Sequence, residues 1–170
     1  MLSKKTNYFS GKKIAEMFIL TKGAKKYIIN IEYCKKRRDK MKYTDKVMEH
    51  FLNPQNAYSM DSYDGKGYYG SVECGDYIEV YIKVKDNILS EVSYMVYGCT
   101  ASVATSSMMS TLAKGKTIEQ AMEITEDDVE NALEGLPEEK RHCSNLGVGA
   151  LKNAIKNYQG IEVSYEESIF

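Results

Sequence analysis

The sequence contains no apolar run approaching the 18 residues that would mark a membrane-spanning helix. Its longest early apolar run, residues 17–20, is far too short for the hydrophobic core of a secretory signal. A net charge of −1 argues against a dedicated nucleic-acid-binding protein, which would be basic. We therefore expect no membrane and no nucleic acid among its partners. The expected location is the cytoplasm, or an organelle matrix if the N-terminus is a presequence.

The near-zero charge hides two parts of opposite sign. Residues 1–40 contain 12 lysines and arginines and three acidic residues. Residues 41–170 contain 11 lysines and arginines and 21 acidic residues. No internal repeat and no linker divides the second part. We expect one domain over residues 41–160, which is long enough for a hydrophobic core, and an acidic tail over residues 161–170.

Residues 1–40 show no clear hydrophobic period beyond a short helix expected over residues 12–20. We expect this basic N-terminal extension to be disordered or not native, with Met41 as the true start. An organelle presequence or a basic docking arm is the alternative, although transit peptides carry more arginine than this segment does. Cys34 lies here and is taken as incidental.

Hydrophobic periodicity predicts an α+β domain. Thr44 is a suitable N-cap for a helix that ends near residue 52. Clean alternation of apolar and polar residues predicts a half-buried strand over residues 77–85, and similar patterns predict strands over residues 68–73 and 91–97. The result is a three-stranded antiparallel sheet with helices packed mainly on one face.

The remaining segments predict loops and covering helices. Residues 55–67 are rich in turn formers, glycine among them, and are expected to be a loop. Small side chains over residues 101–113 predict a helix that approaches the sheet closely. Thr117 and Thr125 are expected to open two short helices, and Ser144 is expected to cap the last long one.

Candidate metal ligands lie at the ends of the predicted elements. Cys74 follows the first strand, Cys99 precedes the small-residue helix and Cys143 precedes the last helix, with Asp76 and His142 beside them. A helix N-terminus stabilises a thiolate, so the pKa of Cys99 is expected to be lowered. Ligands at the ends of elements can meet at one exposed edge of the sheet, where we expect a metal site.

The cysteine spacing alone leaves several interpretations open. No two cysteines are separated by two residues, so neither the zinc-ribbon nor the ferredoxin pattern is present. Three thiolates favour zinc, an iron–sulfur cluster or copper(I) over magnesium or calcium. Buried structural cysteines and a nucleophilic Cys143 activated by His142 remain alternatives. The other histidine, His50, is expected to be a surface or half-buried residue.

Several motifs occur together and in order. They are Tyr43 to Phe51 with Asn53-Pro54-Gln55-Asn56, Gly70 to Cys74-Gly75-Asp76, Tyr97-Gly98-Cys99 with Ala104-Thr105-Ser106-Ser107, Lys114-Gly115-Lys116-Thr117, and Leu136-Pro137 to His142-Cys143-Ser144. Over about residues 42–158 the chain resembles the U-type iron–sulfur cluster scaffold proteins, including the N-terminal domain of the nitrogen-fixation scaffold.

The resemblance implies a platform on which a transient [2Fe–2S] cluster is built and from which it is passed on, with no turnover chemistry of its own. It implies Cys74, Cys99 and Cys143 as ligands, with Asp76 and His142 as the exchangeable fourth, and zinc in the cluster-free form. Sulfur would come from a cysteine desulfurase as a persulfide, with Cys143 as the first candidate acceptor. Iron and electron donors and recipient apo-proteins would be the other partners.

One departure concerns a further partner. The family often has Leu-Pro-Pro-Val-Lys where this chain has Leu136-Pro137-Glu138-Glu139-Lys140, which puts recognition by a heat-shock-type chaperone in doubt. A zinc-bound sulfur-acceptor partner of a cysteine desulfurase is the alternative function, but no extra segment separates Cys99 from Cys143, which favours the scaffold. A thiol hydrolase would need an oxyanion loop that is not evident.

Overall fold

The structure is a computed structural model that describes residues 43–70 and 75–163 throughout, together with four short strands before them. The chain divides into two compact units, residues 1–42 and residues 43–170, close to the boundary expected from the charge pattern. No helix in these described segments is both long and apolar enough to cross a membrane.

The first unit contains two antiparallel strand pairs. Strand β1 (Tyr8–Phe9) pairs with β2 (Lys12–Lys13), and β3 (Met17–Lys22) pairs with β4 (Lys25–Asn30). The helix expected over residues 12–20 is therefore wrong. Strand β3 is joined to β4 by only two residues, and both strands contain isoleucine next to an aromatic residue, which are types that favour strands over helices. Cys34 lies outside the described residues.

The second unit is built on the predicted three-stranded antiparallel sheet, in the order β5 (Gly65–Gly70), β6 (Tyr77–Lys85) and β7 (Ile88–Tyr97). Strand β6 has the predicted bounds. Asp86 and Asn87 connect β6 to β7 with φ angles of 53° and 62°. Positive φ at both central residues is the conformation that a two-residue hairpin turn requires, and Asp and Asn tolerate it better than most residues.

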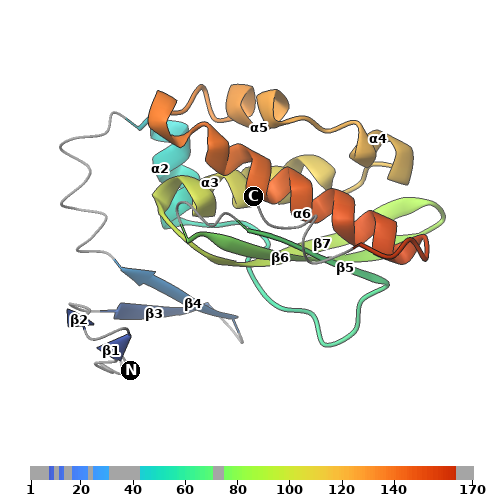
Figure 1. Cartoon of the computed structure of the whole chain (residues 1–170), viewed down its shortest axis with the longest axis horizontal. Coiled ribbons are helices and arrows are strands. Elements are labelled where there is room, and N and C mark those ends of the chain that lie inside the picture. Colours follow the sequence, from blue (N-terminus) through green and yellow to red (C-terminus); the bar gives the residue numbers. More distant parts are fainter. Residues whose placement is uncertain are drawn as a thin grey trace. The chain divides into compact units, whose positions relative to one another are not determined.

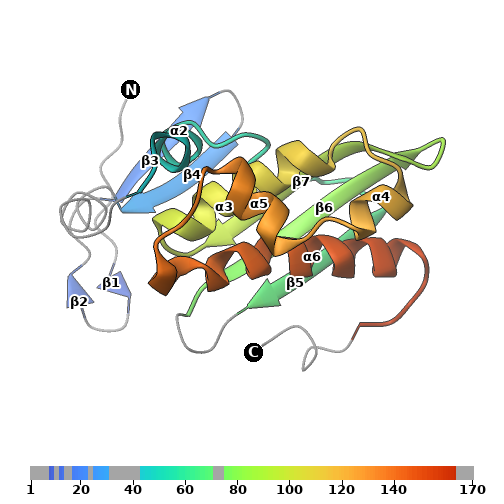
Figure 2. The ribbon, with the colours of Figure 1, turned by 90° about the horizontal axis from the view of Figure 1, so that it is seen from above.

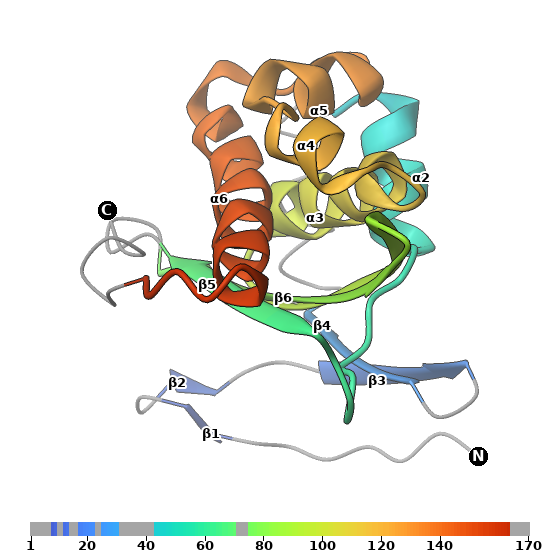
Figure 3. The ribbon, with the colours of Figure 1, turned by 90° about the vertical axis from the view of Figure 1, so that its right-hand side faces the viewer.

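All helices of this unit lie over one face of the sheet (Figures 1 and 3). Helices α3 and α6 pack directly on the sheet, and α6 lies along β5 (Figure 2). Ile78, Val80 and Ile82 of β6 are fully buried on this face. The elements are α2 (Asp45–Leu52), α3 (Thr100–Ala113), α4 (Ile118–Met122), α5 (Glu126–Ala132), the 3₁₀ turn η1 (Glu138–Lys140) and α6 (His142–Tyr158).

Two glycines in β5 bring this strand into direct contact with the backbone of α6. A Cβ atom on Gly65 would lie 2.4 Å from the Ala154 carbonyl oxygen, and one on Gly67 would lie 2.2 Å from the Ala154 nitrogen. Residues 65–67 therefore belong to the sheet. The loop predicted over residues 55–67 ends before Gly65, so its predicted C-terminal boundary is wrong. These glycines serve close packing, a role that the sequence does not distinguish from turn formation.

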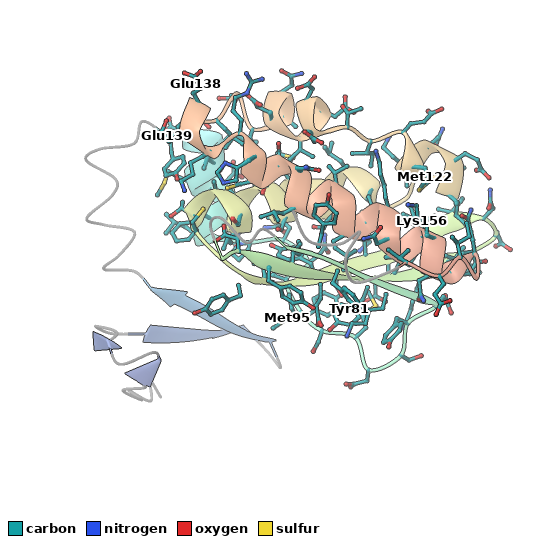
Figure 4. All side chains as sticks on the ribbon, in the orientation of Figure 1. Tyr81, Met95, Met122, Glu138, Glu139 and Lys156 are labelled. Atoms are coloured by element: carbon teal, nitrogen blue, oxygen red, sulfur yellow. The ribbon has the colours of Figure 1, made fainter. Side chains whose placement is uncertain are left out.

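The opposite face of the sheet is partly covered by the segment between α2 and β5. The rings of Tyr63 and Tyr81 lie 5.5 Å apart, and the Tyr58 hydroxyl donates a hydrogen bond to the Glu91 carboxylate. Tyr81 is only 6% exposed, whereas Met95 is 38% exposed. Figure 4 shows both side chains on the side of the sheet away from the helices.

The helix caps were largely predictable. Thr44, Thr117 and Thr125 each accept a hydrogen bond from the backbone three residues later, as expected. Ser144 as a cap is wrong, because the η1 turn runs almost directly into α6, which already begins at His142. The Ser144 hydroxyl instead donates to the Arg141 carbonyl oxygen, at a distance of 2.7 Å.

His50 is more buried than expected, with 7% of its surface exposed. Its Nδ1 atom lies 2.7 Å from the Ser107 hydroxyl, which also accepts a hydrogen bond from the Gln55 N–H. Burial lowers the pKa of His50, since it disfavours the charged imidazolium. This network anchors the chain after α2 to helix α3.

Candidate metal centre

Three of the five predicted ligands converge in the structure. A sulfur atom from each of Cys99 and Cys143 and a carboxylate oxygen of Asp76 all lie within 4.8 Å of one another. The two sulfur atoms are 3.8 Å apart. Asp76 and Cys143 are buried, and Cys99 is half-buried. The residues between positions 75 and 163 thus supply two soft donors and one hard donor to a single point.

The fold brings these residues together through strand pairing. Tyr77 at the start of β6 pairs with Tyr97 at the end of β7, so Asp76 and Cys99 follow from the same end of the sheet. Cys99 is the N-cap residue of α3 and Cys143 lies in the first turn of α6. The Thr105 hydroxyl of α3 donates to the Cys143 carbonyl oxygen at 3.0 Å, which ties the two helices together beside the site.

Gly98 allows the carboxylate to reach the start of α3. A Cβ atom at this position would lie 2.9 Å from Asp76 Cγ and Oδ2, closer than unbonded atoms approach. The Cys99 N–H donates to Asp76 Oδ2 at 3.3 Å. Gly75, immediately before Asp76, has a φ of +68° and is exposed, a conformation that favours glycine. The missing side chain at Gly98 and the backbone conformation of Gly75 therefore set the position of the carboxylate.

Ser102 connects the carboxylate to the first thiol. Its side chain is fully buried. The hydroxyl donates a hydrogen bond to Asp76 Oδ2 and lies 3.4 Å from Cys99 Sγ. Sequence reasoning missed this role, because Ser102 was grouped with the small residues that permit close packing. The available signal was its position three residues after Cys99, which places both side chains on one face of a helix.

The two thiols differ in acidity. A hydrogen bond from the Cys143 thiol, with a smaller contribution from the Ser102 backbone N–H, lowers the pKa of Cys99 to about 6, against the opposing effects of burial and of the Asp76 charge. The pKa of Cys143 is raised, since its proton is held in the hydrogen bond to Cys99 and its sulfur is buried. The pKa of Cys99 is lowered, as expected, but the largest cause is the neighbouring Cys143 thiol and not the N-terminus of α3.

The other two predicted ligands do not join this group. Cys74 lies outside the described residues, so its role stays a prediction. His142 is exposed at the first position of α6 and is not among the residues within 4.8 Å of one another. Its position next to Cys143 keeps it a prediction as an exchangeable ligand.

The arrangement is chemically suited to a soft metal. Two sulfur donors favour zinc, iron–sulfur clusters or copper(I) over the hard cations magnesium and calcium, which prefer oxygen alone. The donors lie at the end of the sheet where Gly75, Tyr97 and Gly98 are exposed. An α+β domain with a mixed cysteine and aspartate group at one end of its sheet belongs to the class of metal- or cluster-binding scaffolds.

Comparison with known proteins identifies the family. Residues 42–164 match the model of the NifU-like N-terminal domain, and the chain belongs to this family. It is 51% identical over 116 residues to the iron–sulfur cluster assembly scaffold protein IscU 1 of Archaeoglobus fulgidus, covering 68% of this chain and 76% of that protein. It is 40% identical over 123 residues to IscU of Haemophilus influenzae, covering 70% of this chain and 97% of that protein.

Solved structures agree on the fold. A NifU-like N-terminal protein from Brucella abortus aligns with a TM-score of 0.57 at 20% identity, covering 70% of this chain and 95% of that one. A putative iron–sulfur cluster assembly scaffold protein for the SUF system from Fervidobacterium islandicum aligns with a TM-score of 0.58 at 19% identity. The alignment covers 67% of this chain and 96% of that one. The predicted resemblance to U-type iron–sulfur cluster assembly scaffolds is confirmed. Proteins of this type are assembly platforms and not enzymes.

Proposed function

We propose that this protein assembles a labile [2Fe–2S] cluster from iron and sulfur and transfers it to apo-proteins. The observation that carries the proposal is the convergence of Cys99, Cys143 and Asp76 at one end of the sheet. Cys74 is proposed as the third cysteine ligand, and His142 as an alternative to Asp76. In the absence of a cluster the same residues would hold zinc.

The mixed ligand set accounts for lability. A carboxylate is a harder and poorer ligand for iron in a sulfur environment than a thiolate is. Asp76 is also engaged by the Ser102 hydroxyl and the Cys99 N–H, so part of its donor capacity is already used. A site in which Asp76 replaces a fourth cysteine should hold a cluster firmly enough to build it and weakly enough to release it.

Sulfur delivery would use a cysteine desulfurase, with Cys143 as the proposed acceptor. The Cys143 thiolate attacks the terminal sulfur of the desulfurase persulfide, the desulfurase thiolate leaves, and a persulfide remains on Cys143. That sulfur needs two electrons to become sulfide, which an external electron donor must supply. Because Cys143 is buried and its pKa is raised, the attack also requires that its sulfur be uncovered and deprotonated when the desulfurase binds.

Anaerobic reconstitution with iron, cysteine and a cysteine desulfurase tests the function. We expect the visible absorption of a [2Fe–2S] chromophore, and its transfer to an apo-ferredoxin. Tight zinc binding with persulfide formation on the protein, but no chromophore, would instead support a zinc-bound sulfur-acceptor partner of the desulfurase. A protein that binds neither metal nor sulfur would contradict both.

Replacing Asp76 with alanine should slow cluster release. The fourth position would then be open to another donor, such as the exposed imidazole of His142, which is softer than a carboxylate. The half-time of cluster transfer from the reconstituted D76A variant to apo-ferredoxin measures this. Glu79 on β6, three residues after Asp76, provides the matched control E79A. Release from D76A as fast as from the native protein or faster would rule out this role for Asp76.

A further inference from the structure

We propose that Ser102 is a positioning residue for the metal centre and acts through Asp76. The inference rests on the proposed metal-binding function. The Ser102 hydroxyl donates a hydrogen bond to Asp76 Oδ2, and its oxygen lies 3.4 Å from the Cys99 sulfur.

The hydroxyl selects which carboxylate oxygen faces the metal. Both the Ser102 hydroxyl and the Cys99 N–H donate to Oδ2 of Asp76. Two donors on one oxygen fix the rotation of the carboxylate and leave Oδ1 as the oxygen that these bonds do not use. A carboxylate held in this way presents one oxygen to a metal without having to become ordered when the metal binds.

Burial makes this hydrogen bond consequential. Asp76 is 7% exposed and Ser102 is fully buried. Water therefore has little access to replace a lost donor, and a buried carboxylate without it is poorly solvated. The removal of the hydroxyl should leave Asp76 less ordered and should weaken the site, even though Ser102 itself does not have to touch the metal.

Neighbouring structure determines the position of Ser102 independently of any metal. It lies in the first turn of α3, and its carbonyl oxygen accepts hydrogen bonds from the Thr105 and Ser106 hydroxyls, at 3.2 Å and 2.6 Å. A Cβ atom on Gly98 would lie 2.9 Å from the Ser102 Cβ. The hydroxyl is therefore preorganised by the helix and by the absence of a side chain at Gly98.

Zinc affinity of the purified chain, measured by competition with a chromophoric chelator, tests the role. We expect S102A to bind zinc about 10–100-fold more weakly, the usual effect of losing a hydrogen-bond partner of a metal ligand. Ser102→Thr keeps the hydroxyl and should restore binding to near the native level. Alanine is smaller than serine and is a better helix former, so S102A should fold, which thermal unfolding of the metal-free protein checks.

Two comparisons separate positioning from a general structural effect. Ser110→Ala removes an equally buried hydroxyl from the same helix, one that donates to the Ser107 carbonyl oxygen and not to a residue of the site, and should leave zinc affinity unchanged. In a D76A background, S102A should have little further effect, because its route to the metal is gone. Equal losses in S102A and S110A, or a full S102A loss in the D76A background, would overturn the proposal. Absence of zinc binding in the native chain would instead count against the proposed metal site itself.

Discussion

Replacing Cys143 with serine is expected to abolish a stable [2Fe–2S] cluster and to lower zinc affinity by more than about 100-fold. A hydroxyl is a harder and weaker donor than a thiolate for both metals. Loss of a direct ligand should cost more than loss of a hydrogen-bond partner of a ligand, for which about 10–100-fold is usual. Visible absorption after anaerobic reconstitution and zinc competition with a chelator measure the two effects.

Cys34→Ser is the matched control. Cys34 is the one cysteine of the sequence that is not a predicted ligand, and its replacement should leave both measurements unchanged. Serine is close to cysteine in size, and the hydrogen bond from Thr105 goes to the backbone of residue 143, so C143S should keep its fold. A C143S protein with the native absorption and cluster lifetime would remove Cys143 from the ligand set.

The same substitution should keep the pKa of Cys99 below that of an ordinary cysteine. In the native site the Cys143 thiol donates to the Cys99 sulfur and is the largest cause of its lowered pKa. A serine hydroxyl can still donate, so Cys99 should remain more acidic than an ordinary cysteine. The alkylation rate of Cys99 as a function of pH would therefore separate the loss of a ligand from the loss of the thiolate.

Much of the fold could be predicted because its signals are local. The alternation in β6 has the bounds found in the structure, and three threonine caps were identified from spacing alone. A strand period or an N-cap depends on residues within one element. The convergence of Asp76, Cys99 and Cys143 was predictable in the same way, since they meet where strands and helices end, and their role as ligands stays a prediction.

The misplaced features depend on contacts between distant segments. Gly67 was assigned to a turn because glycine favours turns. The sequence does not reveal that the backbone of α6 at Ala154, 87 residues later, occupies the space that a Cβ atom on residue 67 would need. Ser102 was missed for a similar reason, since its bond to Asp76 spans 26 residues. His142 differs from these, because it is exposed next to Cys143 and its part as an exchangeable ligand stays a prediction.

Replacing Gly67 with alanine should destabilise the domain by about 3 kcal/mol or more. The added Cβ would lie 2.2 Å from the Ala154 nitrogen and 2.3 Å from the Ala150 carbonyl oxygen. These are backbone atoms of α6, so no side chain can move aside and the helix must separate from β5. Chemical denaturation followed by circular dichroism measures the loss.

Gly147→Ala, in helix α6 itself, is the matched control. Its Cβ would meet only the Met109 side chain, at 3.5 Å, which is an ordinary contact. Alanine is the better helix former by roughly 0.5–1 kcal/mol, so G147A should be neutral or stabilising. If G67A unfolds at the same denaturant concentration as the native protein, β5 does not pack on α6 as the structure has it.

The Gly67 contact also bears on the metal centre. Helix α6 carries Cys143 in its first turn, and β6, which follows Asp76, is hydrogen-bonded to β5. Separation of α6 from the sheet would therefore move Cys143 relative to Asp76, although neither residue is altered. Any G67A protein that still folds should bind zinc more weakly than its G147A counterpart, because the distance between the thiol and the carboxylate is set by how closely this strand and helix pack.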